Sequence, residues 1–180
     1  MFGIGVDRGA AEEGYVAFAH ARAGHLYRAA CLLTGGDSHL AEDLVQETLG
    51  RMYAVWRGSG RIFGARPVED PAAYAQGVLY RLFIDHRRRR SSSEYPVREF
   101  ADRAGPEGDG SLRITLTQAL AALPPRDRAV LVLRYWEDVS AEETAAIVGS
   151  TPGAVRTQAS RALARLRLQL GDSLNDMARP

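Results

Sequence analysis

The sequence of 180 residues contains a single cysteine, no lysine and no long apolar run. A lone Cys31 excludes an intramolecular disulfide bond, which is typical of proteins in a reducing cytoplasm. No stretch reaches the roughly 18 apolar residues that a membrane-spanning helix needs. Residues 1–14 also lack the basic segment and apolar core of a signal peptide. We therefore expect a cytoplasmic protein without membrane insertion, in which Cys31 is a small core residue.

The signatures of common enzyme classes are missing as well. There is no GxxxxGK(S/T) phosphate loop, no HExxH or CxxC motif, and no GxSxG nucleophile motif. The four histidines do not pair at a metal-ligand spacing on one helix face: His20, His25, His39 and His86. Asp43 and Glu47 lie one helical turn apart, which is more typical of a solvated helix face than of an acid/base pair. We expect no catalytic residue, no metal and no cofactor.

Charge is balanced overall but unevenly distributed. The net charge is +1, whereas residues 81–90 and residues 151–170 each carry +4, and residues 91–111 between them carry −3. All basic residues are arginine, whose planar fork suits phosphate and guanine. Four of them, 87–90, follow one another at the predicted end of a helix. Such a run is either solvated or a site for an anion such as DNA phosphate.

Helical periodicity predicts three helices in the first half of the chain, at 12–34, 38–57 and 71–90. Gly35 and Gly36 end the first, Asp37 or Ser38 caps the second, and Asp70 caps the third. Residues 1–11 and 57–70 read as irregular. Residues 91–111 are rich in Ser, Gly, Pro and acids, which predicts a flexible linker.

The second half predicts four more helices and no strand. Helices are expected at 112–122 and 126–135, separated by Pro124 and Pro125, with their apolar sides against two further helices. The expected fold is all-α, with two small helical domains at 12–90 and 112–171 joined by the linker at 91–111.

The last two helices form a helix-turn-helix pattern in residues 138–170. Ser140 and Glu143 have the spacing of a capping box, and Gly149 supplies a turn at positive φ. Thr151 then caps a helix with Pro152 at its first position, and Gly171 suits its C-terminal cap.

The final helix separates an apolar side from a basic side. Its expected buried stripe is Val155, Ala159, Ala162, Leu163, Leu166 and Leu170. Its opposite side carries Arg156, Thr157, Ser160, Arg161 and Arg165. Arginine and small polar side chains on one face are what a helix needs to read the major groove. The alternative is an ordinary solvated amphipathic helix.

Two separate stretches then resemble one known family. AEDLVQETLGRMYAVW at 41–56 resembles region 2.2 of the extracytoplasmic-function (ECF) sigma factors, the smallest members of the sigma-70 family. The segment 119–167, which begins ALAALPPRDRAVLVLRYW, resembles their region 4. The sequence of these motifs is similar to that of the actinobacterial sigma-E branch. The resemblance covers residues 12–170, with the two motifs in the expected order.

The resemblance implies a transcription-initiation factor that binds core RNA polymerase and directs it to promoters. The β′ clamp helices of the polymerase would bind Asp43, Leu44, Gln46 and Glu47. Residues 58–70 and the third helix would recognise and melt the minus-10 element. The basic residues implied there are Arg81, Arg87, Arg88, Arg89 and Arg90.

Region 4 would bind the minus-35 element and dock on the β flap. The residues implied in minus-35 recognition are Thr151, Arg156, Thr157, Ser160, Arg161 and Arg165. The linker would run through the polymerase. An anti-sigma factor is a further partner of many ECF members.

The third helix departs from the family pattern at Gln76, Gly77 and Arg81, which bears on minus-10 preference and melting. Three alternatives remain beside the promoter-specificity subunit. One is a helix-turn-helix regulator that binds duplex DNA alone. Another is a degenerate sigma factor that mainly titrates an anti-sigma factor. The last is an all-helical enzyme.

Overall fold

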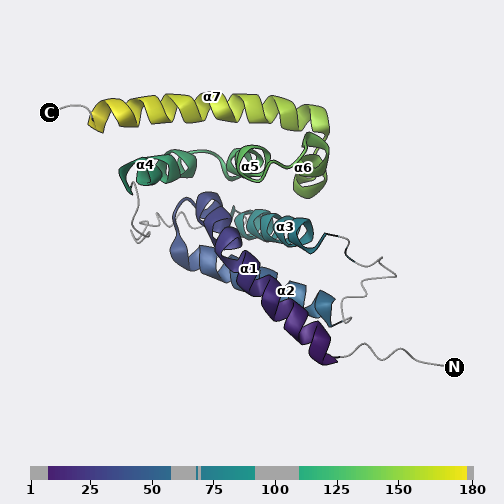
Figure 1. The fold of residues 1–180 in the computed structure, drawn as a ribbon. Coiled ribbons are helices and arrows are strands. Elements are labelled where there is room, and N and C mark those ends of the chain that lie inside the picture. Colours follow the sequence, from purple (N-terminus) through teal and green to yellow (C-terminus); the bar gives the residue numbers. More distant parts are fainter. Residues whose placement is uncertain (1–7, 58–67, 69, 92–109, 178–180) are drawn as a thin grey trace.

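The computed structural model describes residues 8–57, 68, 70–91 and 110–177, and within these ranges the regular structure is entirely helical (Figure 1). The elements are α1 (Arg8–Thr34), α2 (Ser38–Trp56), α3 (Pro71–Ser91), α4 (Gly110–Ala121), α5 (Pro125–Leu131), the π-helical turn η1 (Val132–Trp136), α6 (Ala141–Val148) and α7 (Pro152–Met177). The expected all-α fold is confirmed. Most of the predicted linker at 91–111 and most of the loop at 57–70 lie outside the described residues, while residues 91, 110 and 111 belong to α3 and α4.

The N-terminal half consists of α1, α2 and α3, and its helix ends follow the sequence signals. Gly35 and Gly36 end α1 with φ of 73° and 95°. The Asp37 carboxylate then accepts a hydrogen bond from the Leu40 backbone N–H at 2.9 Å and caps α2. Asp70 caps α3 in the same way. α1 begins four residues earlier than expected, at Arg8 rather than at 12.

The core of this half contains the predicted inward residues and one that sequence reasoning missed. Met52, Leu79, Leu82 and Phe83 are at most 1% exposed. Tyr80, which was not predicted to be buried, is fully buried on α3. Cys31 is half-buried and packs against the edge of this core.

In the C-terminal half, the prediction of one continuous helix at 126–135 is wrong. α5 ends at Leu131, and the chain widens into the π-helical turn η1 before Glu137. The Val139 backbone N–H then reaches back to the Leu133 carbonyl at 2.9 Å, and Asp138 adopts a positive φ of 52°. This wide turn faces Glu137 toward the N-terminal half.

The helix-turn-helix of α6 and α7 is confirmed in its local details. The capping box of Ser140 and Glu143 is present, and Gly149 is left-handed with φ 64°. Thr151 accepts the Ala154 N–H at 3.2 Å. The expected end at Gly171 is wrong, because α7 continues to Met177. Positions 170, 174 and 177 keep the helical apolar spacing, so one helical glycine does not end the helix.

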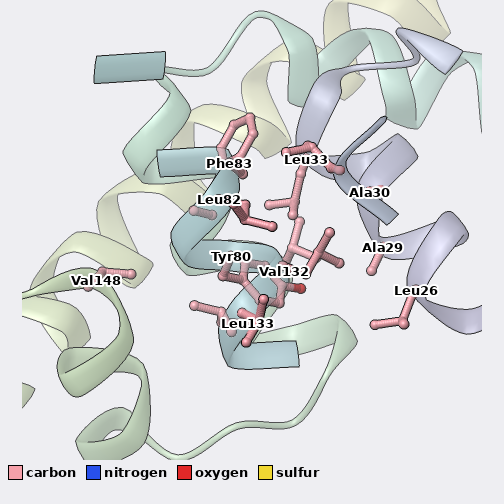
Figure 2. Close-up of a cluster of buried hydrophobic side chains, with 14 of the residues drawn as sticks. Leu26, Ala29, Ala30, Leu33, Tyr80, Leu82, Phe83, Val132, Leu133 and Val148 are labelled. Atoms are coloured by element: carbon pink, nitrogen blue, oxygen red, sulfur yellow. The ribbon is translucent and has the colours of Figure 1, made fainter. Parts of the chain in front are cut away.

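The two halves share a hydrophobic core. Figure 2 shows Leu26, Ala29, Ala30 and Leu33 of α1 beside Tyr80, Leu82 and Phe83 of α3, together with Val132 and Leu133 of η1 and Val148 of α6. The approach is close at Gly35, where a Cβ would meet the Ala121 Cβ at 2.7 Å. α5 and α6 therefore pack on two sides, against α7 on one and against the N-terminal half on the other (Figure 1).

Arg128 of α5 connects the halves through backbone carbonyls. Its residue is 6% exposed, and its guanidinium donates to the carbonyls of Leu33 at 2.8 Å, Ala121 at 3.0 Å and Leu123 at 3.2 Å. Leu33 lies in the last turn of α1, where carbonyls lack partners within the helix. Burial, and then the charge of Arg87, lower the pKa of Arg128 to about 10.

A second polar contact between the halves centres on Glu137. Its side chain is 1% exposed, and one oxygen is within 2.7 Å of His25 Nε2 and accepts a hydrogen bond from the Gln76 amide. Burial and the charge of Glu137 raise the pKa of the Tyr80 hydroxyl well above its usual value. A buried carboxylate of the C-terminal half thus has its polar partners on α1 and α3 of the N-terminal half.

Candidate nucleic-acid interface

The outer face of α7 carries the predicted minus-35 residues together. All six are exposed on α7 or at its cap: Thr151, Arg156, Thr157, Ser160, Arg161 and Arg165. The opposite side of α7 is buried, with Val155, Ala159, Ala162 and Leu166 at most 9% exposed. The predicted separation of faces is therefore present, with Leu163 and Leu170 only partly buried.

The N-terminal turn of α7 is fixed by short hydroxyl side chains. Thr151 caps it, and the Thr157 hydroxyl donates to the Gly153 carbonyl at 3.1 Å. No Cβ would meet any atom within 4 Å at Gly153, so this turn is open to a ligand. The positive end of the helix dipole favours an anion such as phosphate here.

Arg156 is oriented by the preceding helix. Its guanidinium lies 3.1 Å from the Glu142 carboxylate, and the two side chains are 62% and 65% exposed. Hydrogen bonding from its own backbone and then from Arg156 lowers the pKa of Glu142. An ion pair this exposed contributes little stability, so Arg156 can exchange Glu142 for a phosphate or a guanine at small cost.

A groove of about 440 Å³ runs between α5 and α7. It is lined by Asp127, Gly153, Ala154, Thr157, Gln158, Arg161 and Arg165. Asp127 accepts hydrogen bonds from Gln158 at 2.8 Å and from Arg165 at 2.6 Å. Sequence reasoning missed Asp127 and Gln158, because their contact joins residues 31 positions apart.

The second predicted basic patch lies on α3. Arg81, Arg88 and Arg89 are exposed and Arg87 is half-buried, whereas the side chain of Arg90 lies outside the described residues. The patches are not brought together, since α5 and α6 lie between α3 and α7 (Figure 1).

The predicted polymerase-binding residues lie on α2, with one correction. Asp43, Gln46 and Glu47 are exposed, and Glu47 pairs with Arg51 at 2.6 Å. Leu44 is 4% exposed, because it belongs to the apolar stripe that packs α2 on α1 and α3. It therefore supports this surface from beneath and is not part of it.

The described residues contain no group of three or more His, Cys, Asp or Glu side chains that could hold a metal ion. Among the same residues, no helix is long and apolar enough to cross a membrane.

Comparisons with known proteins agree with this geometry. Residues 113–166 match the family "Sigma-70, region 4". The RNA polymerase sigma-E factor of Streptomyces antibioticus is 36% identical over 132 residues, which cover 72% of this chain and 70% of that protein. The ECF RNA polymerase sigma factor SigD of Mycobacterium tuberculosis is 36% identical over 140 residues, 71% of this chain and 61% of SigD.

A solved structure shares the fold over most of the chain. It is the sigma factor RpoE of Bartonella quintana in complex with the anti-sigma factor NepR, with a TM-score of 0.67 and 26% identity. The match covers 88% of this chain and 98% of that one. The region 4 match and the likeness to sigma-E, SigD and RpoE confirm the resemblance to the extracytoplasmic-function sigma factors. This chain belongs to the extracytoplasmic-function sigma factors of RNA polymerase.

Proposed function

We propose that this sigma factor binds core RNA polymerase, reads a minus-35 element with α7 and opens the minus-10 element with the N-terminal half. The observation that carries the proposal is the exposed arginine face of α7, placed by a capped helix-turn-helix inside the segment that matches sigma-70 region 4. The polymerase supplies the chemistry, so the sigma factor itself needs no catalytic residue.

At the minus-35 element, α7 enters the major groove with its N-terminal turns. Arg156 and Arg161 are exposed and can bind guanine or phosphate through two N–H groups. Thr151, Thr157 and Ser160 place hydroxyl groups at the same end. Arg165 lies farther along α7, where a helix in the major groove leaves toward the phosphates.

At the minus-10 element, the exposed arginines of α3 support a strand-binding role. Unpairing and unstacking cost a few kcal/mol per base, which contacts with the separated strand must offset. Arg81, Arg88 and Arg89 give α3 the positive surface for such contacts. The predicted base-holding loop at 58–70 falls almost wholly outside the described residues.

The acidic side of α2 is the proposed surface for the β′ clamp helices, through Asp43, Gln46 and Glu47, while the C-terminal half docks on the β flap. We include an anti-sigma factor among the partners, because the similar RpoE was determined in complex with one.

Run-off transcription with core polymerase on a genomic promoter library tests the proposal. We expect transcripts that depend on this protein and share two upstream elements. Arg161→Ala should weaken the minus-35 preference by about 5- to 150-fold, which is roughly the 1–3 kcal/mol of a base contact. Arg22→Ala, which removes an exposed arginine from α1, is the matched control and should change nothing.

Other outcomes separate the alternatives. Core binding without transcripts would support a degenerate sigma factor and would count against promoter opening by α3. Duplex binding without any affinity for core would support a regulator that acts on DNA alone.

A further inference from the structure

Asp127 has an unusual position for a carboxylate in a region that binds DNA. It lies in the first turn of α5, and the residue is 8% exposed. Its two oxygens face α7, where Oδ1 accepts from the Gln158 amide at 2.8 Å and Oδ2 accepts from Arg165 at 2.6 Å. Both partners line the groove that also contains Thr157 and Arg161.

The contact with Asp127 fixes the side chains of Gln158 and Arg165 beside the exposed arginine face of α7. Gln158 and Arg165 are seven residues apart, which is two turns of one helix face and about 10 Å along the axis. Asp127 reaches both because their long side chains converge on it. An element outside α7 therefore sets how α7 presents two of its polar groups.

The chemistry of a carboxylate determines the direction of the Gln158 amide. An ionised carboxylate only accepts hydrogen bonds, so the amide nitrogen of Gln158 must point toward Asp127 and the amide oxygen must point away. Gln158 is then presented with its acceptor outward. Without the carboxylate, either face of the amide could point outward.

The same contact reduces the free positive charge of α7. The Arg165 side chain is 57% exposed, but its charge is offset by a carboxylate at 2.6 Å. Attraction to phosphates is independent of sequence and increases with each cation available to neutralise them. A paired Arg165 therefore adds less to nonspecific binding than a free one.

We propose that Asp127 is a positioning residue for minus-35 recognition, which orients Gln158 and restrains Arg165 so that α7 discriminates sequence instead of binding any duplex. The inference rests on the proposed function, because it assigns α7 to the minus-35 element. Its effect is a difference of affinities, achieved by weakening the contact to wrong sequences.

The test uses Asp127→Asn in the full chain, assembled with core polymerase. A minus-35 element is first selected with the wild-type holoenzyme from duplexes randomised at this position. Binding of the selected duplex and of a scrambled duplex is then measured between 50 and 200 mM salt. The set includes Arg165→Ala, the double variant, and Asp127→Glu as the conservative change.

Asp138→Asn is the matched control. It also removes one negative charge from the C-terminal half, at an exposed position with positive φ. Asparagine tolerates this backbone conformation, so any effect of net charge alone appears in both variants. Thermal unfolding of each variant reports whether the fold is kept.

We expect Asp127→Asn to steepen the dependence of log K on log salt by about 0.9, the slope of one further phosphate contact. Between 50 and 200 mM salt this is an additional loss of about 3.5-fold. Preference for the selected duplex over the scrambled one should fall. The change in slope should vanish in the Arg165→Ala background. Asp127→Glu should restore part of the preference for the selected duplex.

A slope that is unchanged, shallower or equal to that of Asp138→Asn would overturn the inference, as would an equal slope change in the Arg165→Ala background. Loss of binding with an unchanged slope would mean that Asp127 has only a structural role. If the wild-type holoenzyme selects no upstream sequence at all, the proposed function itself fails. The two failures are therefore distinguishable.

Discussion

Arg128 illustrates how a single residue can connect two segments far apart in the chain. Its guanidinium donates hydrogen bonds to three carbonyls, one at the end of α1, one at the end of α4 and one just after α4. A buried charge is costly unless hydrogen bonds compensate it. Arginine suits this position because its planar fork offers five donors in fixed directions.

Arg128→Lys should lower the free energy of unfolding by about 2 kcal/mol, because one ammonium cannot reach all three carbonyls and leaves buried acceptors unpaired. Urea unfolding followed by circular dichroism measures this. Arg126→Lys is the control, since exposed Arg126 donates to Val148 and Gly149 only at 3.3 Å and its replacement should cost under about 1 kcal/mol. Equal losses in the two variants would contradict the assigned role.

Tyr80 makes stability depend on alkaline pH. Its pKa in the folded state lies above the ordinary value of 10, so the folded protein keeps a proton that the unfolded chain releases. The contribution is complete below pH 10 and is lost as pH rises from 10 toward the folded-state pKa.

The free energy of unfolding should therefore fall above pH 10 by up to about 1.4 kcal/mol per pH unit from this group. Tyr80→Phe should remove that part of the slope. Urea titrations at several alkaline pH values compare it with Tyr135→Phe, at a position 59% exposed. If Tyr80→Phe and Tyr135→Phe keep the same slope as wild type, the buried hydroxyl does not carry the effect.

Residues of this kind mark the limit of sequence reasoning. The exposed arginines of α7 could be assigned from spacing, because one helix places them by its own geometry. Asp127 and Glu137 could not, because their partners lie on other helices at separations of 31 to 112 residues. Leu44 was assigned to a surface although its position in the apolar stripe of α2 buries it.

At the scale of elements, helix starts with a side-chain cap were predictable, whereas the end of α7 and the change from α5 to η1 were not. A cap is a contact between residues three apart, so Asp37, Ser140 and Thr151 identified their helices from sequence. Gly171 did not end α7, because a glycine ends a helix only where the following chain turns away. The π-helical turn η1 depends on packing against the N-terminal half, which the local pattern does not contain.

Gly77 and Gly149 test this distinction with the same substitution. Gly77→Ala should stabilise the protein by about 0.5–1 kcal/mol, because alanine is the better helix former and its Cβ would meet only Arg81, at 3.8 Å. Gly149→Ala should destabilise it by about 1–2 kcal/mol, because φ is 64° there and no contact compensates. Thermal unfolding of both variants decides, and shifts of the same sign would contradict the argument.

At the scale of the whole molecule, the closely packed halves span a shorter distance than the one that separates the two promoter elements. Elements at minus-35 and minus-10 are about 85 Å apart, from 25 base pairs at 3.4 Å each. A compact chain of this length has a radius of gyration of about 16 Å, so it is about 40 Å across. If α7 binds the minus-35 element and α3 the minus-10 element, as proposed, the halves must separate to reach both.

Separation breaks the polar contacts at Glu137, whose carboxylate is buried by the N-terminal half. His25→Ala with Gln76→Ala removes both donors to the Glu137 oxygen that His25 and Gln76 share and leaves that buried oxygen unpaired, which is strongly unfavourable for the closed form. Small-angle scattering should show the radius of gyration rising from about 16 Å to above 20 Å. Circular dichroism should show unchanged helix content.

Adding Glu137→Leu to this pair is the decisive control, because an apolar side chain needs no donor and replacement of a whole buried polar cluster by apolar groups is often neutral. The triple variant should return to the compact radius. Glu12→Leu, at an exposed position of α1, should not rescue the pair. Expansion that persists in the triple variant would mean that lost packing, rather than the unpaired charge of Glu137, opens the molecule. An unchanged radius in the double variant would mean that the shared apolar core alone holds the halves together.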